Sequence, residues 1–348
     1  MLNFIPKYVK IRKTWLIIEG LCMKLGIKTI EKLTQGAIYF ESREGYIYSY
    51  HYSKDQLEGF KREGFVDGWL ERAHFHGGIF VRFITDATEL CLTYKPSGFS
   101  SNQNTIDIYV DNNLHTSKHL DSSKKQALSC NFRHGVKEIT IYLPFDCQLG
   151  LKSIEINGTY RSIKKKTKKI LIIGDSITQG YGANISSCAY VNALERKTNL
   201  DIVAQGIGGY RFEPCDINKI EGYEPDGVIS ALGTNYYESH HKESGEYDYE
   251  NSTSKYFERL SKLYSDKQIL CITPLWRDDN VDMERLLYCI EVIKREASKY
   301  ENITIVDGFD LVPHCKSCFD DNLHPNEYGS ELYAQNLAGV IKELGIFD

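Results

Sequence analysis

No charge of one sign dominates this chain of 348 residues. It has 42 Lys and Arg against 47 Asp and Glu, for a formal net charge of −5. Proteins that bind nucleic acid usually carry a basic excess, so we expect no nucleic-acid partner. The chain also lacks a run of about 18 apolar residues, and we expect no membrane span.

A clear signal peptide is missing too. Basic residues between 7 and 13 precede the apolar residues 15–18, but Glu19 and Lys24 interrupt the next apolar stretch. A signal peptide needs about 7–15 uninterrupted apolar residues and a small-residue cleavage site. Ten cysteines are scattered along the chain, which argues against a disulfide scaffold. We therefore expect a cytoplasmic protein with reduced thiols; export by an unrecognised route is the alternative.

The length predicts two domains rather than one. Hydrophobic residues make up 42% and charged residues 26% of the chain, as in ordinary globular proteins. Aromatic content is 12%, mostly from 24 tyrosines. So many tyrosines fit a sugar-facing surface, but they also fit ordinary strands.

The first half has the pattern of strands. Ile106, Ile108 and Val110 alternate with polar or half-polar residues, and a turn signal is present at 111–113. Residues 139–143 alternate in the same way. We predict an N-terminal extension of uncertain structure at 1–34 and an antiparallel β-sandwich, jelly-roll-like, at 35–160. No helical period of comparable strength is present there.

A basic segment separates the halves. Residues 161–169 include six Lys or Arg in nine positions. We interpret 161–168 as a solvated linker, with a polyanion-binding patch as the alternative.

After residue 169 strands and helices alternate. Strands are predicted near 169–173, 201–205, 226–231, 268–273 and 303–306, and helices near 187–197, 251–264, 281–300 and 326–344. This pattern predicts an α/β domain at 169–348, a three-layer doubly wound sheet of about five parallel strands. Because it holds its own sheet, we expect it to fold alone.

Ser176 stands at the end of the first of these strands. The apolar run 170–173 stops at Gly174, Ser176 comes two residues later, and Gly180 closes the turn. The carboxyl ends of parallel strands are where α/β sheets carry their chemistry. A serine at such a turn often only caps a helix, so Ser176 alone is weak evidence.

Three further loops come after predicted strands of the same domain. They are Gln205 to Tyr210, which is rich in glycine, Ala231 to Asn235, and Asp320 to Asn326. All of them should open at the same edge of the sheet as Ser176.

These four blocks resemble those of the SGNH (GDSL-type) hydrolases. In order they read Gly-Asp-Ser-x-Thr-x-Gly, a glycine block, Gly-Thr-Asn and Asp-x-x-His-Pro, within residues 168–348. A β-sandwich before such a domain is similar to carbohydrate esterase family two. The resemblance implies a flavodoxin-like strand order and a serine esterase that removes small acyl groups, such as O-acetyl, from carbohydrate.

The resemblance also implies roles for individual residues. Ser176 resembles the nucleophile, His324 the general base, and Asp321 the group that orients the imidazole, with Asp320 as the weaker alternative. The N–H groups of Ser176 and Gly209 and the amide of Asn235 resemble the oxyanion hole.

One departure affects the second block. The family usually has an asparagine before its key glycine, where this chain has Ala204 and Gln205. The donor glycine therefore stays open among Gly206, Gly208 and Gly209.

The chemistry supports these residue types. A serine hydroxyl needs a base to remove its proton, and histidine titrates near working pH. A carboxylate holds the imidazole tautomer, and donors must await the negative charge that develops on the attacked carbonyl.

No metal or cofactor is expected. His314, Cys315 and Cys318 make half of a zinc spacing with no second pair nearby, and the glycine block is not a dinucleotide fingerprint. The alternatives are a lipid-acyl esterase or thioesterase, an acyltransferase with the same residues, and a non-catalytic glycan-binding protein. The natural substrate and the oligomeric state stay open.

Overall fold

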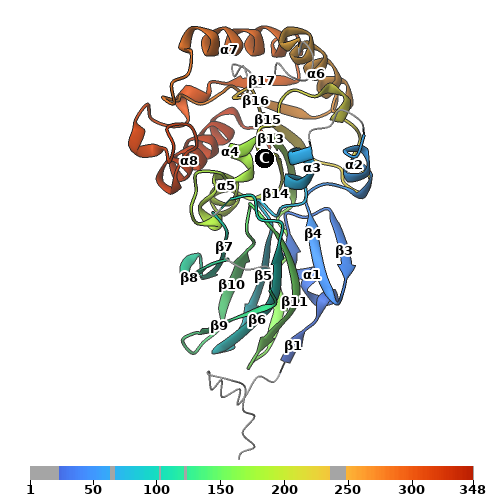
Figure 1. Ribbon diagram of the computed structural model, residues 1–348, viewed down its shortest axis with the longest axis vertical. Helices are drawn as coiled ribbons and strands as arrows, with labels where there is room; N and C mark the ends of the chain where they lie inside the picture. The colour runs from blue at the N-terminus through green and yellow to red at the C-terminus, as the bar shows by residue number, and fades with distance from the viewer. Residues whose placement is uncertain (1–22, 63–66, 102, 121–123, 236–247, 348) are drawn as a thin grey trace, which may run out of the picture.

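The structure, a computed structural model, describes residues 23–62, 67–101, 103–120, 124–235 and 248–347. It has a β-sandwich followed by an α/β domain, and the two lie end to end (Figure 1). Residues 1–22 of the predicted extension lie outside the described part of the chain.

Two antiparallel sheets form the sandwich. The first has the order β3-β4-β11-β6-β9 with β1 on β11, and the second β12-β5-β10-β7-β8 with β2 on β5. Their bounds are β1 (Met23–Leu25), β2 (Thr34–Gln35), β3 (Tyr39–Arg43), β4 (Tyr46–Tyr50), β5 (Phe80–Thr85), β6 (Glu89–Ser97), β7 (Thr105–Val110), β8 (Asn113–His119), β9 (Gln126–Asn131), β10 (Lys137–Tyr142), β11 (Gln148–Ile156) and β12 (Tyr160–Ser162).

The alternating pattern of the sequence accounts for the inner face. Ile106 and Ile108 of β7, like Ile139 and Ile141 of β10, are fully buried in the sandwich core. From β4 to β11 the pairing is nested, first strand with last and second with seventh, which is consistent with the jelly-roll expectation.

Residues 23–35, placed mostly in the extension by the sequence, belong to the sandwich. Met23 pairs with Ile156 of β11, and a short helix, α1 (Ile27–Leu33), comes next. Ile30 and Leu33 are buried in the sandwich core. The sandwich therefore begins by residue 23.

The second domain has a five-stranded parallel sheet in the order β14-β13-β15-β16-β17. The second strand in sequence is outermost, so the predicted flavodoxin-like order is confirmed. Its elements are β13 (Lys168–Gly174), α4 (Ser176–Gln179), α5 (Tyr190–Lys197), β14 (Leu200–Gly206), β15 (Gly227–Ala231), α6 (Tyr249–Leu263), β16 (Gln268–Ile272), α7 (Met283–Ala297), β17 (Ile303–Val306) and α8 (Glu327–Leu344).

Both faces of this sheet are covered. Ile170 and Ile172 of β13 pack in one core cluster with α5 and α8, whereas Leu171 and Ile173 point to the other face, toward α6 and α7. Successive residues of a strand point to opposite faces, so the apolar run of β13 serves both cores. The predicted three-layer arrangement is confirmed.

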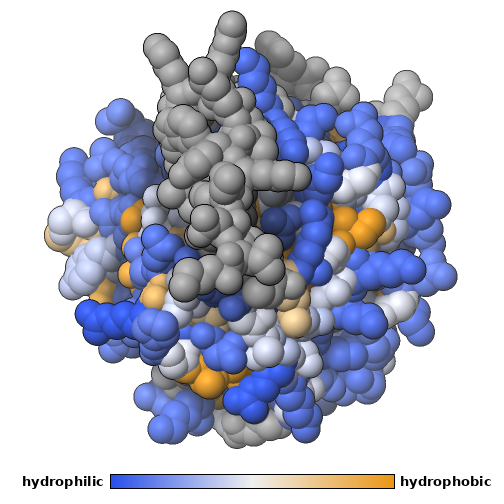
Figure 2. Space-filling view, turned by 90° about the horizontal axis from the view of Figure 1, so that it is seen from below, coloured by the Kyte–Doolittle hydropathy of each residue, from blue (hydrophilic) through white to orange (hydrophobic). Residues whose placement is uncertain are grey.

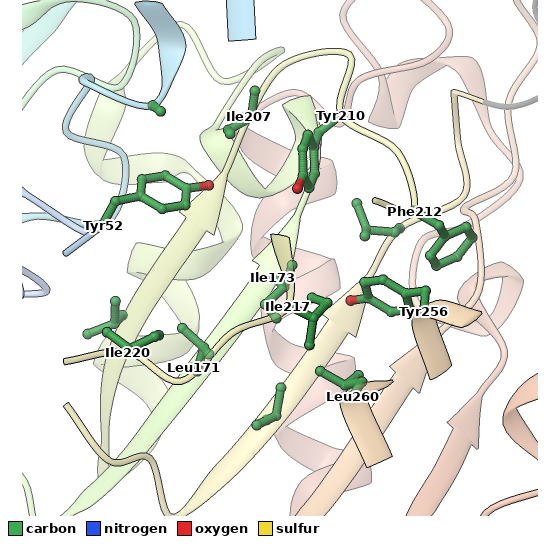
Figure 3. Packing of buried hydrophobic residues seen from close by; sticks show 14 of the residues in the cluster. Tyr52, Leu171, Ile173, Ile207, Tyr210, Phe212, Ile217, Ile220, Tyr256 and Leu260 are labelled. Carbon is green, nitrogen blue, oxygen red and sulfur yellow. The ribbon is translucent and has the colours of Figure 1, made fainter. Parts of the chain in front are cut away.

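One part of the second face is covered by the first half of the chain. The connection from β14 to β15 holds only a 3₁₀ turn at Pro214–Asp216. Tyr52 instead packs in the same cluster as Leu171 and Ile217 (Figure 3). Phe60 belongs to this cluster as well. Tyr52 and Phe60 flank α2 (Lys54–Gly59), which precedes α3 (Asp67–Arg72), and the sequence predicted neither helix.

The tyrosines of β4 belong to this shared core. Tyr46, Tyr48 and Tyr50 are at most 7% exposed and pack in the cluster that includes the α/β sheet. The strand interpretation therefore applies to them rather than the sugar-facing one.

Polar contacts also join the domains. Arg82 of β5 makes two hydrogen bonds to the carboxylate of Glu195 on α5, and Lys166 contacts the same carboxylate. The side chain of Lys166 is only 20% exposed. This residue of the predicted solvated linker therefore packs against the α/β domain, because Glu195 needs positive partners to be buried.

Where the described residues are seen from the free end of the sandwich, the surface is mostly hydrophilic, with small separate hydrophobic patches (Figure 2). In the described part of the chain, no helix has the length and apolar character to cross a membrane.

Candidate active site

Ser176 lies at the carboxyl end of β13, as predicted from the sequence. It is the first residue of α4, and the Asp175 carboxylate caps this helix by accepting the Ile177 N–H at 3.0 Å. The first N–H groups of a helix have no intrahelical acceptor, so the Ser176 N–H is available to a ligand.

The structure brings Ser176, His324 and Asp321 together in one hydrogen-bonded chain. His324 Nε2 lies 2.8 Å from Ser176 Oγ, and His324 Nδ1 lies 2.7 Å from Asp321 Oδ2. A proton on Nδ1 directed at the carboxylate leaves Nε2 as the acceptor for the serine hydroxyl. The His324 side chain is 15% exposed, so a substrate can reach it.

Asp321 and Asp320 have different partners. Asp321 Oδ1 also accepts the backbone N–H groups of Leu323 and His324. Burial raises its pKa, but the bonds from His324 outweigh burial and hold the pKa well below its usual range. Asp320 faces the sandwich, where its Oδ2 accepts from Gln103 Nε2 at 3.2 Å. The geometry therefore favours Asp321 over Asp320.

The turn after α4 supports the histidine loop. A Cβ atom on Gly182 would lie 2.7 Å from the His324 Cβ, so only glycine fits there. The Tyr181 ring lies 5.7 Å from the imidazole, centroid to centroid. Its hydroxyl donates to Asp146 of the sandwich at 2.6 Å.

The glycine block separates the three candidate donors. Gly206 is the last residue of β14 and pairs with Gly174. The Gly208 N–H donates to Gln179 Oε1 at 2.6 Å. Gly209 has φ +78°, which favours glycine, and none of the residues that the structure describes accepts its N–H. Gly209 is thus the glycine with a free donor.

Asn235 joins this block from the third loop. Its Nδ2 donates to the Tyr210 carbonyl at 2.9 Å, and an amide nitrogen carries a second proton. Behind it, the fully buried Arg277 donates to the Thr234 carbonyl at 3.2 Å and pairs with Asp279.

The first half of the chain contributes to the site, which the sequence did not predict. Arg72 of α3 donates to the Gly208 carbonyl at 2.8 Å, and Gln103 accepts the Gly182 N–H at 3.2 Å. Buried Gln179 of α4 donates to the Phe145 carbonyl at 3.1 Å. No spacing in the sequence signals these contacts, because they depend on how the domains pack.

Gln205 is one of the two residues that stand where the family usually has an asparagine, and it helps to pack the first half of the chain against the α/β domain. Its Nε2 donates to the His51 carbonyl at 2.8 Å and to Gln56 Oε1 at 3.0 Å. Gln205 therefore holds the segment around α2 in place over the parallel sheet.

The three residues with half of a zinc-site spacing do not gather around a common point in the structure. The His314 ring stacks on Trp276, Cys315 is exposed and Cys318 is buried. Among the residues described, no three His, Cys, Asp or Glu side chains gather as metal ligands would. The nine cysteines in that part of the chain are free thiols.

Comparison with known proteins agrees with this geometry. Residues 172–332 match the GDSL-like Lipase/Acylhydrolase family. The α/β domain therefore resembles the SGNH-type hydrolases in its sequence blocks and in its fold. A search of curated protein sequences gave no match.

Solved structures similar to this chain include both domains. A salicylyl-acyltransferase, SsfX3, from a tetracycline biosynthetic pathway has a TM-score of 0.72 at 17% identity, covering 93% of this chain and 98% of its own. A family two carbohydrate esterase from Clostridium thermocellum, in complex with cellohexaose, has a TM-score of 0.63 at 18% identity. The match covers 90% of this chain and 99% of the esterase. An acetyl xylan esterase from the rumen bacterium Butyrivibrio proteoclasticus has a TM-score of 0.62 at 14% identity. The match covers 94% of this chain and 99% of that esterase. The two-domain arrangement is thus like that of carbohydrate esterase family two.

Proposed function

We propose that this protein is a serine esterase that removes small acyl groups, chiefly O-acetyl, from carbohydrate. The observation that carries the proposal is the hydrogen-bonded chain from Ser176 through His324 to Asp321 at the carboxyl end of β13. This chain supports the proposal because acyl transfer requires a nucleophile, a base and an orienting carboxylate in that order.

In the first step Ser176 Oγ attacks the ester carbonyl while its proton moves to His324 Nε2. The carbonyl π electrons move onto oxygen, and the ionised Asp321 stabilises the imidazolium. When the tetrahedral intermediate collapses, the C–O bond to the sugar breaks and His324 protonates the leaving oxygen. Water then attacks the acyl-serine by the same route and releases acetate.

The oxyanion hole has three donors in this mechanism. They are the N–H groups of Ser176 and Gly209 and the second amide proton of Asn235. Gly208 cannot take part without losing its bond to Gln179. Such preplaced donors contribute because the charge they meet exists only in the transition state.

The carbohydrate substrate rests on the arrangement of the domains. Sandwich loops contact the site through Gln103 and Asp146, so a substrate bound at Ser176 would meet both domains. Of the similar structures with this arrangement, one is described as a family two carbohydrate esterase and one as an acetyl xylan esterase. Fold does not fix substrate, so this assignment is an analogy.

Acyl transfer to an acceptor hydroxyl is the second candidate. It is favoured by the likeness over 93% of the chain to a protein described as an acyltransferase. The same residues would serve, with a sugar hydroxyl in place of water in the second step.

The test is acetate release from acetylated glycosides and polysaccharides, compared with lipid esters and thioesters. Ser176→Ala should abolish turnover, and Ser298→Ala, at an exposed helix end, should leave it unchanged. Peptide mapping after a fluorophosphonate should find the label on Ser176. Label elsewhere, with Ser176→Ala still active, would refute the mechanism. Acylated acceptor in excess over free acetate would favour transfer.

A further inference from the structure

We propose that Arg72 is a positioning residue of the oxyanion hole, which holds and polarises the peptide group between Gly208 and Gly209. Arg72 lies on α3, outside the predicted hydrolase domain, and nothing in the four sequence blocks includes it. The inference rests on the proposed function, in which the Gly209 N–H is a donor to the oxyanion.

The position of the Arg72 hydrogen bond carries the inference. Arg72 Nη1 donates to the Gly208 carbonyl oxygen at 2.8 Å. That oxygen and the Gly209 N–H belong to the same planar peptide group. The described peptide bonds are trans, so the two groups point in opposite directions. A carbonyl held toward Arg72 therefore directs the Gly209 N–H away from Arg72.

A second side chain fixes the neighbouring peptide. Gln179 Oε1 accepts the Gly208 N–H at 2.6 Å, so both peptide groups that flank Gly208 are held by side chains. Gly208 and Gly209 are adjacent glycines with wide conformational freedom. Without these anchors the donor peptide could rotate, and the oxyanion hole would not be preorganised.

The charge of Arg72 adds a second effect. A hydrogen bond from a guanidinium to a carbonyl is charge-assisted and draws electrons toward the oxygen. Hydrogen bonds in a chain polarise one another, so the N–H at the other end of the peptide becomes a stronger donor. The effect is greatest when negative charge develops on the substrate, which is in the transition state.

A second arginine makes the same kind of contact. Arg277 Nη1 donates to the Thr234 carbonyl, whose peptide group continues into Asn235. Each arginine thus binds the carbonyl that immediately precedes a residue proposed for the oxyanion hole. Arg277 comes from the α/β domain, whereas Arg72 comes from the segment before the sandwich strand β5. The first half of the chain would then complete the site in catalysis as well as in packing.

The experiment compares Arg72→Met and Arg72→Lys with Arg196→Met. Arg196 also bridges the domains, because its guanidinium lies over the rings of Tyr109 and Tyr142, and these contacts lie away from the glycine block. Four quantities are measured on each full-length variant. They are kcat and KM on an acetate ester, the rate of fluorophosphonate labelling of Ser176, and Tm.

We expect Arg72→Met to lower kcat by roughly 10- to 100-fold, less than loss of an oxyanion donor itself, with KM within about threefold. Labelling should slow by a similar factor, because the phosphoryl oxygen enters the same hole. Lysine should restore part of both rates. Arg196→Met should change neither by more than about threefold, whatever its Tm.

The outcomes separate the alternatives. A raised KM with unchanged kcat would make Arg72 a substrate contact, and equal losses in Arg196→Met would make it a docking residue; either overturns the inference, as do unchanged rates. If Arg72→Met does not fold, the lysine variant decides by the same kcat and labelling criteria. Slower labelling in an enzyme that releases no acetate from any carbohydrate would support Arg72 and refute the substrate. An unlabelled parent Ser176 would refute both the proposed function and this inference.

Discussion

Arg82 of the sandwich and Glu195 of the α/β domain form a bidentate ion pair across the domain boundary. Arg82 Nη1 and Nη2 lie 2.9 and 2.8 Å from the two carboxylate oxygens, and the side chains are 8% and 3% exposed. Burial raises the pKa of Glu195, but the Arg82 hydrogen bonds and the Lys166 charge outweigh it and lower the pKa. The two domains are therefore joined by a buried ion pair, and each of its charges would be costly to bury without the other.

Breaking this pair should destabilise the whole chain. Arg82→Met leaves Glu195 buried with only Lys166 and should lower the free energy of unfolding by about 3–5 kcal/mol. Because the Glu195 pKa is lowered by folding, its contribution is present above the unfolded pKa and is lost as pH falls through the folded one. Urea denaturation at neutral and acidic pH should therefore show the difference from the parent shrinking in acid.

Lys24→Met is the matched control for Arg82→Met. Lys24 pairs with Glu155 at 2.8 Å, but its side chain is 62% exposed. An exposed pair contributes about 0–1 kcal/mol. A loss in Arg82→Met no larger than in Lys24→Met would show that the interdomain pair is not needed for stability.

The α/β domain should not fold well by itself, contrary to the expectation from the sequence. In a fragment from residue 165, Leu171 and Val203 would lose the cover that Tyr52 and Phe60 provide. An exposed apolar face of this kind promotes association. We expect the fragment to be insoluble or to bind a hydrophobic dye, with no cooperative thermal transition, whereas the full chain unfolds cooperatively. A soluble fragment with a sharp transition would show that the face is covered in another way.

Much of the α/β domain could be predicted from the sequence. The strand expected at 303–306 coincides with β17, and the helix expected at 326–344 differs from α8 by one residue. Buried parallel strands and amphipathic helices leave strong periodic patterns. The placement of Ser176 beside His324 and Asp321 could also be predicted, because strand ends meet at one edge of a parallel sheet.

The contribution of the first domain could not be predicted. α2 and α3 have six residues each, too short for a helical period to be distinct. The contact of Arg72 with Gly208 spans 136 positions and results from domain packing alone. The choice of Gly209 over Gly208 likewise required the position of Gln179, which cannot be placed from the sequence.

Replacing Asp175 should make the protein more stable at neutral pH. Burial raises the pKa of this fully buried carboxyl from 3.8 to about 6, against the opposing effect of the Ile177 N–H and the nearby His324 and Arg277. A raised pKa means that stability falls as pH rises from the unfolded toward the folded value, and stays low above it. The asparagine of Asp175→Asn would be neutral throughout and could still accept the Ile177 N–H.

The Tm of Asp175→Asn should therefore exceed that of the parent by an amount that grows between about pH 4 and 6 and is constant above. At about 1.36 kcal/mol per unit of pKa shift, the corresponding gain in the free energy of unfolding is at most about 3 kcal/mol. A gain already complete at pH 4 would show that shape rather than charge is responsible. A lower Tm at pH 7 would show that the ionised carboxylate is well satisfied in the fold.

The last prediction separates two adjacent aspartates. Asp321 meets His324 Nδ1 at 2.7 Å, whereas Asp320 faces Gln103 of the sandwich. Since the Asp321 pKa is held well below its usual range, its carboxylate is ionised at any practical assay pH. Asp321→Asn presents an amide that can stabilise the wrong imidazole tautomer, and by analogy with the serine proteases kcat should fall by roughly 10³–10⁴. Asp320→Asn keeps an oxygen that can accept from Gln103 and should change kcat by less than about threefold.

The loss in Asp321→Asn should persist from about pH 5 to 9, because no protonation of the parent carboxylate occurs in that range. Steady-state kinetics on an acetate ester, with Tm as the check on folding, decide the matter. Equal losses in both variants would mean that the loop needs both carboxylates for its shape. A larger loss in Asp320→Asn would reverse the assignment and require His324 to turn toward the sandwich in the working enzyme.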